Sequence, residues 1–177
     1  EILEHAVRNK EPITVYQDYD VDGCTAGAIA VECLTDLGAE VHRYCNERAV
    51  DGFGICANGV DNMMSQYPAT KVLLTVDNGI SGIAGVARAK ELGLKVVVTD
   101  HHEPGEALPV ADAVIDPKRT DEPDAQYKDN CGAGVIWRIM LELYMRMGVS
   151  VEPVMKAVDL AALGTVADVV PLMGQNR

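Results

Sequence analysis

The sequence is poor in aromatic and basic residues and contains no long apolar run. Phe, Trp and Tyr make up 5% of its 177 residues, and 15 Lys and Arg are outnumbered by 27 Asp and Glu, which gives a net charge of −12. A generic nucleic-acid binder carries a basic surface, so a nucleic-acid substrate would require metal ions or further domains to supply positive charge. No apolar stretch reaches the roughly 18 residues of a membrane span, and the charged N-terminus is unlike a signal peptide.

Zinc-type cysteine spacing is also missing. The five cysteines, at positions 24, 33, 45, 56 and 131, are odd in number and include no CxxC pair. Free thiols in a reducing cytoplasm are the simplest interpretation, so we predict a cytoplasmic protein. Cys24 and Cys33 fall within an apolar helical run, where small buried residues are expected, and we assign neither of them any chemistry.

Strand and helix patterns alternate along most of the chain. Predicted strands cover residues 13–16, 40–45, 71–76, 95–99 and 112–115, and predicted helices cover residues 24–37, 59–67 and 81–92. This order favours an α/β fold with a mostly parallel sheet of about five strands and helices on both faces. A polar loop is expected at 116–130, followed by a helical C-terminal part with helices at 134–147 and 153–169.

Residues 1–177 are expected to form one domain. Hydrophobic residues make up 48% of the chain, which suits a single sizeable core. The sequence starts within a helical pattern and without Met, which suggests a domain taken from a longer protein.

The stretch QDYDVDG, residues 17–23, places three aspartates at alternate positions before a glycine. It is open to three interpretations: a calcium-binding EF-hand loop, the start of a phosphatase with an aspartate nucleophile, or a cradle for catalytic metal ions that cut phosphate esters. An EF-hand loop requires Glu at its twelfth position, which is Ile29 when counted from Asp18, and it follows a helix rather than a strand. We therefore exclude the calcium loop.

Three predicted strands end in acidic or histidine residues. The first is followed by Asp18, Asp20 and Asp22, the one at 71–76 by Asp77, and the one at 95–99 by Asp100, His101 and His102. Parallel strands bring their carboxyl ends to one edge, where open α/β sheets bind ligands, and alternate aspartates of an extended segment project to one side. So many anions require cations, and a mixed carboxylate and imidazole set favours Mn²⁺ or Mg²⁺. The aspartate-nucleophile phosphatase and a non-catalytic scaffold stay open as alternatives.

Seven ordered blocks make the sequence similar to the DHH phosphoesterase superfamily and, within it, to the RecJ-like exonucleases. The blocks are VYQDYDVDG (15–23), NERAVDGFGI (46–55), LLTVDNGISG (73–82), VVVTDHHEPGEALP (96–109), VIDPKR (114–119), NCGAGVIWRI (130–139) and DLAALGTVADVVPLMGQNR (159–177). The three letters DHH alone would be weak evidence, whereas seven blocks in order over nearly the whole chain are specific.

The resemblance implies a set of site residues. Two manganese or magnesium ions would be held by Asp18, Asp20, Asp22, Asp77, His101 and Asp168, with Asp77 as the bridging ligand. His102 would face the substrate phosphate, and Arg48, Gly132 and Gly134 would belong to the substrate site, although both glycines also fit simple helix entry. Some relatives have a histidine at the position of Tyr16, so Asp18 is expected to take over that ligand role. Asp168 lies in an apolar helical run and is indicated by the resemblance alone.

The implied activity is metal-dependent hydrolysis of single-stranded DNA from the 5′ end, with Asp77, His101 and His102 as catalytic residues. The implied partners are single-stranded nucleic acid and further domains of the parent chain. These would be a DHH-associated domain and a nucleic-acid-gripping barrel, which this sequence stops before. Hydrolases of short oligonucleotides, cyclic dinucleotides or pyrophosphate are the alternatives within the superfamily.

Overall fold

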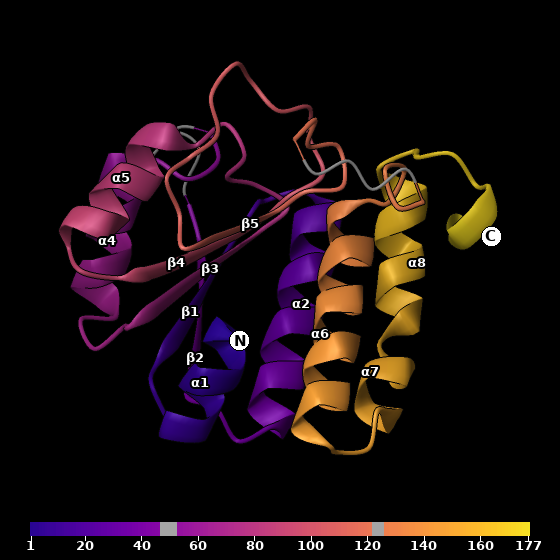
Figure 1. The fold of residues 1–177 in the computed structure, drawn as a ribbon, viewed down its shortest axis with the longest axis horizontal. Helices are drawn as coiled ribbons and strands as arrows, with labels where there is room; N and C mark the ends of the chain where they lie inside the picture. The colour runs from indigo at the N-terminus through magenta and orange to yellow at the C-terminus, as the bar shows by residue number, and fades with distance from the viewer. Residues whose placement is uncertain (47–52, 122–125) are drawn as a thin grey trace.

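The computed structural model describes residues 1–46, 53–121 and 126–177 and contains a five-stranded parallel sheet (Figure 1). The strands are β1 (Ile13–Gln17), β2 (Val41–Cys45), β3 (Val72–Val76), β4 (Lys95–Thr99) and β5 (Ala113–Ile115). They lie in the order β2-β1-β3-β4-β5, and every neighbouring pair is parallel. The predicted parallel sheet of about five strands is confirmed.

Two of the three inner strands, β1 and β3, are buried along their whole length. Every residue of β1 and of β3 is buried, as expected where helices cover both faces of a parallel sheet. Their register pairs Ile13 with Val72 and Gln17 with Val76. Because all five strands run in the same direction, their carboxyl ends meet at one edge of the sheet.

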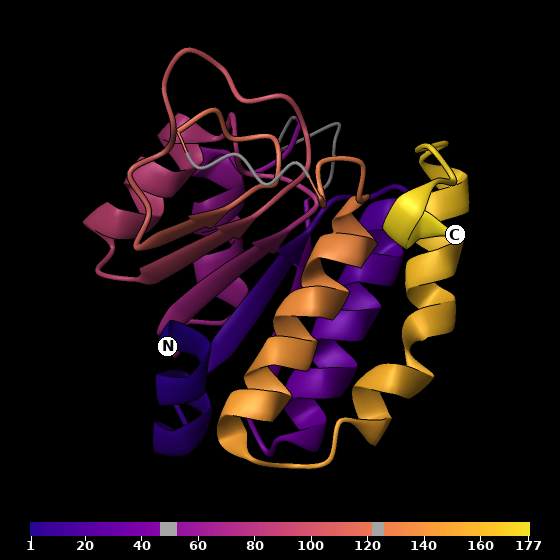
Figure 2. The same ribbon diagram turned by 45° about the vertical axis from the view of Figure 1, so that its right-hand side comes forward.

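Helices cover both faces of the sheet, as predicted. They are α1 (Ile2–Asn9), α2 (Val21–Asp36), α4 (Ala57–Gln66), α5 (Ile83–Glu91), α6 (Gly132–Met147), α7 (Glu152–Lys156) and α8 (Val158–Ala167), and a 3₁₀ turn covers Gly174–Asn176. The helices α2, α6, α7 and α8 form a layer on one face, and α4 and α5 pack on the other (Figure 1, Figure 2). The side chains of β1 divide accordingly, since Val15 joins the core under α2 and α6 and Tyr16 the core under α4 and α5.

The sequence pattern predicts where the helices are but not all of their ends. Helix α2 begins at Val21 rather than at residue 24, because the Asp20 side chain caps it by accepting a hydrogen bond from the N–H of Gly23 at 2.9 Å. The single helix predicted at 153–169 is wrong. At Ala157 the backbone leaves α-helical geometry (φ −82°, ψ 5°), and two helices form instead. Within the described residues, no helix is long and apolar enough to cross a membrane.

Candidate metal centre

Acidic and histidine side chains gather where β1, β3 and β4 end. Asp18 follows β1, Asp77 follows β3, and Asp100, His101 and His102 follow β4. These three strands are neighbours in the sheet, so the side chains after them meet at its carboxyl edge. Asp77, Asp100 and His101 are 2%, 1% and 4% exposed, which is unusual for residues of this kind.

The aspartates of the first motif reach this edge by a geometry that differs from the prediction. An extended segment carrying all three is wrong, because β1 ends at Gln17 and α2 begins at Val21. Asp20 is the N-cap of α2 and Asp22 lies in its first turn, where a carboxylate stabilises the free N–H groups of a helix. The three aspartates therefore come from a strand end, a helix cap and a helical turn.

The carboxylate of Asp22 is held by the N-terminus of a second helix. Its Oδ2 accepts a hydrogen bond from Gly132 N at 2.6 Å, and its Oδ1 accepts one from Ala133 N at 2.9 Å. Both N–H groups belong to the first turn of α6, where unpaired donors and the helix dipole favour an anion. Space also requires glycine at position 132, since a Cβ there would lie 2.6 Å from the Asp77 side chain. Helices α2 and α6 are thus joined at the cluster.

His101 lies among the buried carboxylates without a hydrogen bond to any of them. Its Nε2 is 3.0 Å from Asp77 Oδ1, 3.6 Å from Asp22 Oδ2 and 3.8 Å from Asp168 Oδ2. The shortest of these contacts is not oriented as a hydrogen bond, and among the described residues neither ring nitrogen of His101 nor Asp77 Oδ1 has a partner. Buried polar atoms normally have one. Convergent ligand atoms without partners are the arrangement that a bound cation completes.

Three overlapping sets of side chains in the described part of the chain could each hold an ion. In each set, one ligand atom per residue lies within 4.8 Å of the others. The sets are Asp18, Asp20 and Asp77; Asp22, His101 and Asp168; and Asp77, His101 and His102. All six residues expected to bind metal are therefore brought together. Asp77 belongs to two sets and connects the aspartates after β1 with the histidines after β4.

The backbone at Asp77 is strained. Its φ of 60° is uncommon for a residue other than glycine and costs on the order of 1–3 kcal/mol. The next residue holds the turn in place, because Asn78 Nδ2 donates hydrogen bonds to Tyr16 O at 3.1 Å and to Val76 O at 3.0 Å. Strain of this kind is typical of functional sites, where the surrounding structure fixes one orientation of a side chain.

Burial raises the pKa of Asp77 and lowers the pKa of His101, the two residues that each belong to two ligand sets. Burial, followed by the charges of Asp22 and Asp20, raises the pKa of Asp77 to about 10. In the absence of cations this carboxyl group therefore keeps its proton at neutral pH. Burial, followed by the charge of His102, lowers the pKa of His101. A neutral imidazole is the form that coordinates a metal ion.

His102 is exposed and is oriented by Asp100. Asp100 Oδ1 lies 2.7 Å from His102 Nδ1 and accepts hydrogen bonds from the N–H groups of His101 and His102, and its Oδ2 accepts one from Ile80 N. The hydrogen bond to Asp100 outweighs partial burial and raises the pKa of His102 to about 9. Burial acts to raise the pKa of Asp100, but the hydrogen bonds from His102 and Ile80 lower it below its usual value. At neutral pH, His102 is thus an imidazolium held through Nδ1, with Nε2 left to donate.

The structure gives specific roles or positions near the cluster to three residues: Asp100, predicted from the sequence only as a strand-end residue, and Gly164 and Asp116, for which the sequence predicts no role. Asp100 orients His102. Gly164 of α8 lets that helix approach the cluster, because a Cβ there would collide with Asp22 and lie 2.8 Å from Ala133 Cβ. Asp116, directly after β5, is 5% exposed, its Oδ2 has no partner among the described residues, and its pKa is raised by burial and then by the charge of Asp100. The strand-end rule that indicates Asp77 would also have indicated Asp116.

The structure separates the residues expected at the substrate site. Gly132 contributes an N–H to the cluster, whereas the N–H of Gly134 lies 3.4 Å from the thiol of Cys131, which caps α6. Helix entry is therefore the role seen for Gly134. Arg48 lies outside the described residues. Asp168 is the C-cap of α8, a position at which the apolar pattern of that helix gives no signal.

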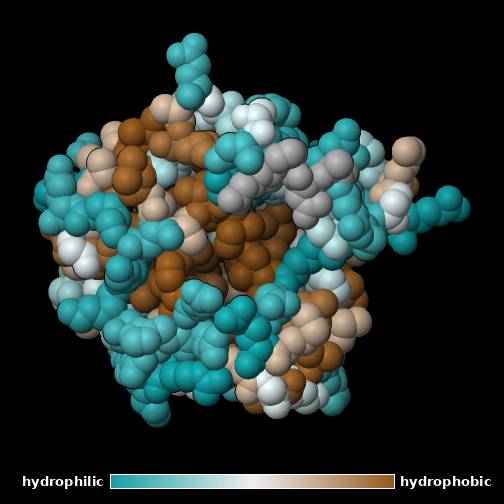
Figure 3. Space-filling view, viewed as in Figure 1, coloured by the Kyte–Doolittle hydropathy of each residue, from teal (hydrophilic) through white to brown (hydrophobic). Residues whose placement is uncertain are grey.

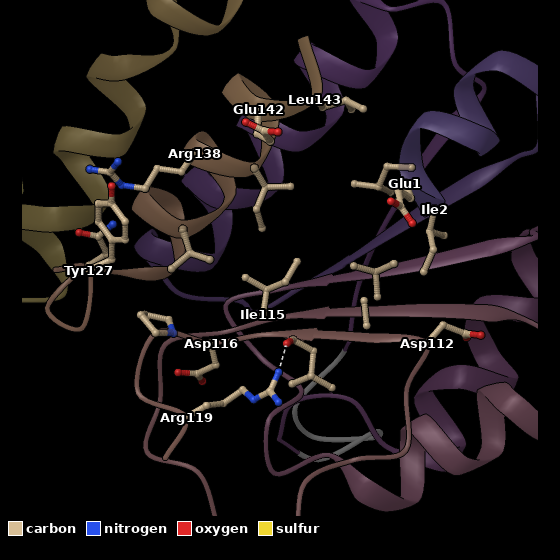
Figure 4. Close-up of a pocket in the computed structure, with 18 of the residues that line it drawn as sticks. Glu1, Ile2, Asp112, Ile115, Asp116, Arg119, Tyr127, Arg138, Glu142 and Leu143 are labelled. Atoms are coloured by element: carbon tan, nitrogen blue, oxygen red, sulfur yellow. Dashed lines mark hydrogen bonds between the residues drawn. The ribbon is translucent and has the colours of Figure 1, made fainter. Parts of the chain in front are cut away.

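A groove of about 800 Å³ lies on another part of the surface, between β5 and α6. The centre of the face in Figure 3 is an apolar hollow, whose floor in Figure 4 comes from the sheet and from α6. The apolar lining includes Val97, Ala113, Ile115, Val135, Ile139 and Leu143. At one end Arg138 stacks on Tyr127 at 4.1 Å, and Glu1 and Ile2 lie at the other. In the part of the chain that the structure describes, none of the six expected metal ligands lines this groove.

Comparisons with known proteins identify relatives over nearly the whole chain. The model of the DHH family, N-terminal domain, matches residues 12–165. The chain is 38% identical over 187 residues to the single-stranded-DNA-specific exonuclease RecJ of Escherichia coli (strain K12), which covers 100% of this chain and 32% of that protein. It is 41% identical over 176 residues to the protein of the same name from Thermus thermophilus, covering 99% of this chain and 25% of that protein.

Solved structures of RecJ also match nearly the whole chain. A crystal structure of exonuclease RecJ bound to manganese matches with a TM-score of 0.88 at 41% identity, covering 99% of this chain and 43% of that one. RecJ from Thermus thermophilus in complex with Mn²⁺ matches with a TM-score of 0.83 at 39% identity, and the match covers 99% of this chain and 24% of that one. The chain thus spans less than half the length of each of these relatives.

Proposed function

Because the chain belongs to the DHH family, we propose that it is the catalytic domain of a RecJ-like exonuclease that hydrolyses single-stranded DNA from the 5′ end with two divalent cations. The observation that carries this proposal is the three ligand sets, which are linked because Asp77 and His101 each belong to two of them. Support also comes from relatives whose names specify single-stranded DNA and from structures of RecJ with Mn²⁺ or Mg²⁺. On this proposal, residues 1–177 form one domain of a larger enzyme.

The side chains at the strand ends suit Mn²⁺ or Mg²⁺. Carboxylate oxygens would come from Asp18, Asp20, Asp22, Asp77 and Asp168, and an imidazole nitrogen from His101. Oxygen-rich sets suit both cations, and the imidazole favours manganese. Asp77 would bridge the two ions, because its carboxylate belongs to the set after β1 and to the set after β4. Cation binding would also replace the proton that the raised pKa of Asp77 retains, so metal affinity would rise with pH.

Two divalent cations bound here would supply Lewis acidity for the attack of water on phosphorus and for the charge that develops on the phosphoryl oxygens. The residues of this chain would hold the ligand atoms in fixed positions. Asp77 and His101 fix the centre of the site from two strands, and the N-terminus of α6 fixes Asp22. His102, held by Asp100, would donate from Nε2 to a non-bridging phosphoryl oxygen, and losing such a donor typically costs about 10²–10³ in rate.

Cleavage of 5′-labelled single strands of varied length with Mn²⁺ tests the proposal in the full-length parent protein. We expect mononucleotides released from the 5′ end, no product after chelation of the metal, and no product from Asp77→Asn. Asp61→Asn is the matched control, because Asp61 is a half-buried carboxylate of α4 that pairs with Arg88. Cleavage restricted to very short oligonucleotides, cyclic dinucleotides or pyrophosphate would assign the site to a small-substrate hydrolase. Mn²⁺ binding without any hydrolysis would favour the alternative that the chain is a non-catalytic scaffold.

A further inference from the structure

Two exposed thiols lie near the candidate metal centre. The apolar pattern predicts a buried Cys24, and this is wrong, whereas Cys33 of the same helix is buried as expected. Because α2 begins at Val21, Cys24 falls near its start, at the carboxyl edge of the sheet. Cys45 is the last residue of β2 at the same edge and is also exposed.

The register of β1 and β2 places both thiols on one face of the sheet. Tyr16 and Tyr44 are paired across the two strands, and their ring centroids lie 5.1 Å apart in the core under α4 and α5. Side chains alternate between the faces of a strand, so the next pair, Gln17 and Cys45, points to the opposite face. This is the face that α2 covers.

Gln17 is the common neighbour of the two thiols. Its Nε2 lies 3.4 Å from Cys24 Sγ, and it is paired with Cys45 across strands that are about 4.8 Å apart. Helix and sheet are in close contact here, since a Cβ at Gly27 would collide with the Gln17 side chain. The Gln17 side chain thus contacts one thiol and stands beside the residue that carries the other, on the face of the sheet that α2 covers.

We propose that Cys24 and Cys45 form a redox modification site, at which hydrogen peroxide converts the two thiols into an intramolecular disulfide. The sulfur of one thiolate attacks the O–O bond, which yields a sulfenic acid and hydroxide. The second thiol then displaces the sulfenic oxygen as water and forms the S–S bond. Two thiols and one peroxide thus give one disulfide and two waters.

The same bridge would act on the metal centre, a consequence that rests on the proposed function. Cys24 Sγ donates a hydrogen bond to Tyr19 O at 3.5 Å, and Cys24 N donates one to Asp20 O at 2.8 Å. Disulfide formation removes the first of these bonds and pulls the start of α2 toward β2. Asp18 and Asp20, which offer ligand atoms from the same loop, would therefore lose their alignment with Asp77.

Non-reducing peptide mapping by mass spectrometry after a peroxide titration tests the bridge. We expect one linked peptide containing positions 24 and 45, with the loss of two thiols per chain, while the buried Cys33 and Cys131 remain thiols. Cys24→Ser and Cys45→Ser should each abolish the link and leave a sulfenic acid that dimedone traps. Cys56→Ser, which keeps a capping side chain on α4, is the control that should link normally. Separate oxidation of the two residues to sulfinic acids, or links between different chains, would overturn the proposal.

Calorimetric titration with Mn²⁺ tests the effect on the metal centre. Oxidised protein should bind Mn²⁺ about tenfold more weakly, as expected when groups supporting the ligands are disturbed. Dithiothreitol should restore the affinity, and Cys45→Ser should show no response to peroxide. A bridge that leaves Mn²⁺ affinity unchanged would overturn this coupling. Reduced protein that binds no Mn²⁺ would instead contradict the proposed function, and the peptide map would still decide the bridge.

Discussion

The carboxyl edge of the sheet and the groove between β5 and α6 depart from ordinary side-chain placement in opposite directions. At the edge, Asp22, Asp77, Asp100 and His101 are between 1% and 4% exposed. In the groove, apolar side chains border a hollow of about 800 Å³, and Ile115 is 39% exposed. Burying a charged group costs several kcal/mol unless it is paired, whereas leaving one apolar side chain exposed forgoes only roughly 1.5–3 kcal/mol.

This difference favours the carboxyl edge of the sheet as the site of the proposed chemistry. At the edge, hydrogen bonds offset part of the free-energy cost of burying the carboxylates. The N–H groups of α6 donate to Asp22, and Asp100 is paired with His102. Asp77 Oδ1 and both nitrogens of His101 have no such partner among the described residues, and a cation would supply it.

Among the described residues that line the groove, only Asp116 has a buried side-chain oxygen without a hydrogen-bond partner, and its other oxygen accepts a hydrogen bond from Lys118 N. Judged by volume, the groove would be the candidate site. Judged by buried polar groups that converge without hydrogen-bond partners, the strand edge is the candidate site.

The largest expected effect comes from removing the residue shared by two ligand sets. Asp77→Asn removes the charge but keeps the side-chain shape, and Asn tolerates the positive φ of this position. We expect Mn²⁺-dependent cleavage to fall at least about a thousandfold, since the loss of a bridging ligand should cost about 4 kcal/mol or more. Single-turnover cleavage under Mn²⁺ measures this. A variant that kept more than about a tenth of the wild-type rate would contradict the bridging role.

Substitution of the two adjacent histidines is expected to affect different properties: turnover for His102 and Mn²⁺ affinity for His101. His102→Ala should keep near-normal Mn²⁺ affinity by calorimetry and lose about 10²–10³ in turnover, because a donor to the phosphoryl oxygen is removed. His101→Ala should weaken Mn²⁺ binding itself, and added Mn²⁺ should partly rescue its activity. Loss of metal from His102→Ala and none from His101→Ala would reverse the two roles.

Metal-free protein should become less stable as the pH rises, by several kcal/mol over the range in which Asp77 keeps its proton. The pKa of Asp77 is about 10 when folded, against a usual value of 3.8. Between these values the folded state holds a proton that the unfolded state has released, so the free energy of unfolding falls with pH. His102 acts in the same direction between 6.5 and about 9. His101, whose pKa is lowered in the folded state, acts in the opposite direction below 6.5, so the contribution of Asp77 is obtained from urea unfolding of wild type and an Asp77 variant over the same pH range.

Asp77→Asn provides the matched control for this pH dependence. In metal-free protein it should reduce the slope and raise stability at neutral pH by at least about 1 kcal/mol, or roughly 2–4 °C in Tm for a chain of this size. The same substitution would therefore stabilise the fold while abolishing cleavage. An unchanged slope in Asp77→Asn would show that this carboxyl group does not keep a proton in the folded state.

Much of the fold and part of the site could be predicted from short-range patterns. The apolar runs indicate five strands, their alternation with helices indicates parallel order, and parallel order brings Asp18, Asp77 and His101 to one edge. Alternate spacing at residues 18–22 favoured an extended segment, but the preference of aspartate for helix caps determined the local structure instead.

The rest of the site depends on contacts between distant parts of the chain. Asp22 is held by N–H groups more than a hundred residues later, a link that no local pattern contains. Asp168 and Gly164 reach the cluster only because α8 packs against α2 and α6. Position 168 follows an apolar helix whose sequence indicates packing and nothing more. Only the resemblance to a known family could therefore indicate Asp168 in advance.

The smallest effect is expected from a substitution in the groove between β5 and α6. Ile115→Thr keeps the β-branched shape that suits β5 and shortens a side chain that is 39% exposed, so the free energy of unfolding should fall by less than about 1 kcal/mol. Mn²⁺ affinity and the cleavage rate should stay within about twofold of wild type, because no expected ligand lines the groove. Urea unfolding and the strand-cleavage assay measure both quantities. A tenfold loss of cleavage at unchanged stability would mean that apolar surface beside β5 contacts the substrate. Buried polar groups without partners would then no longer be enough to locate the functional surface.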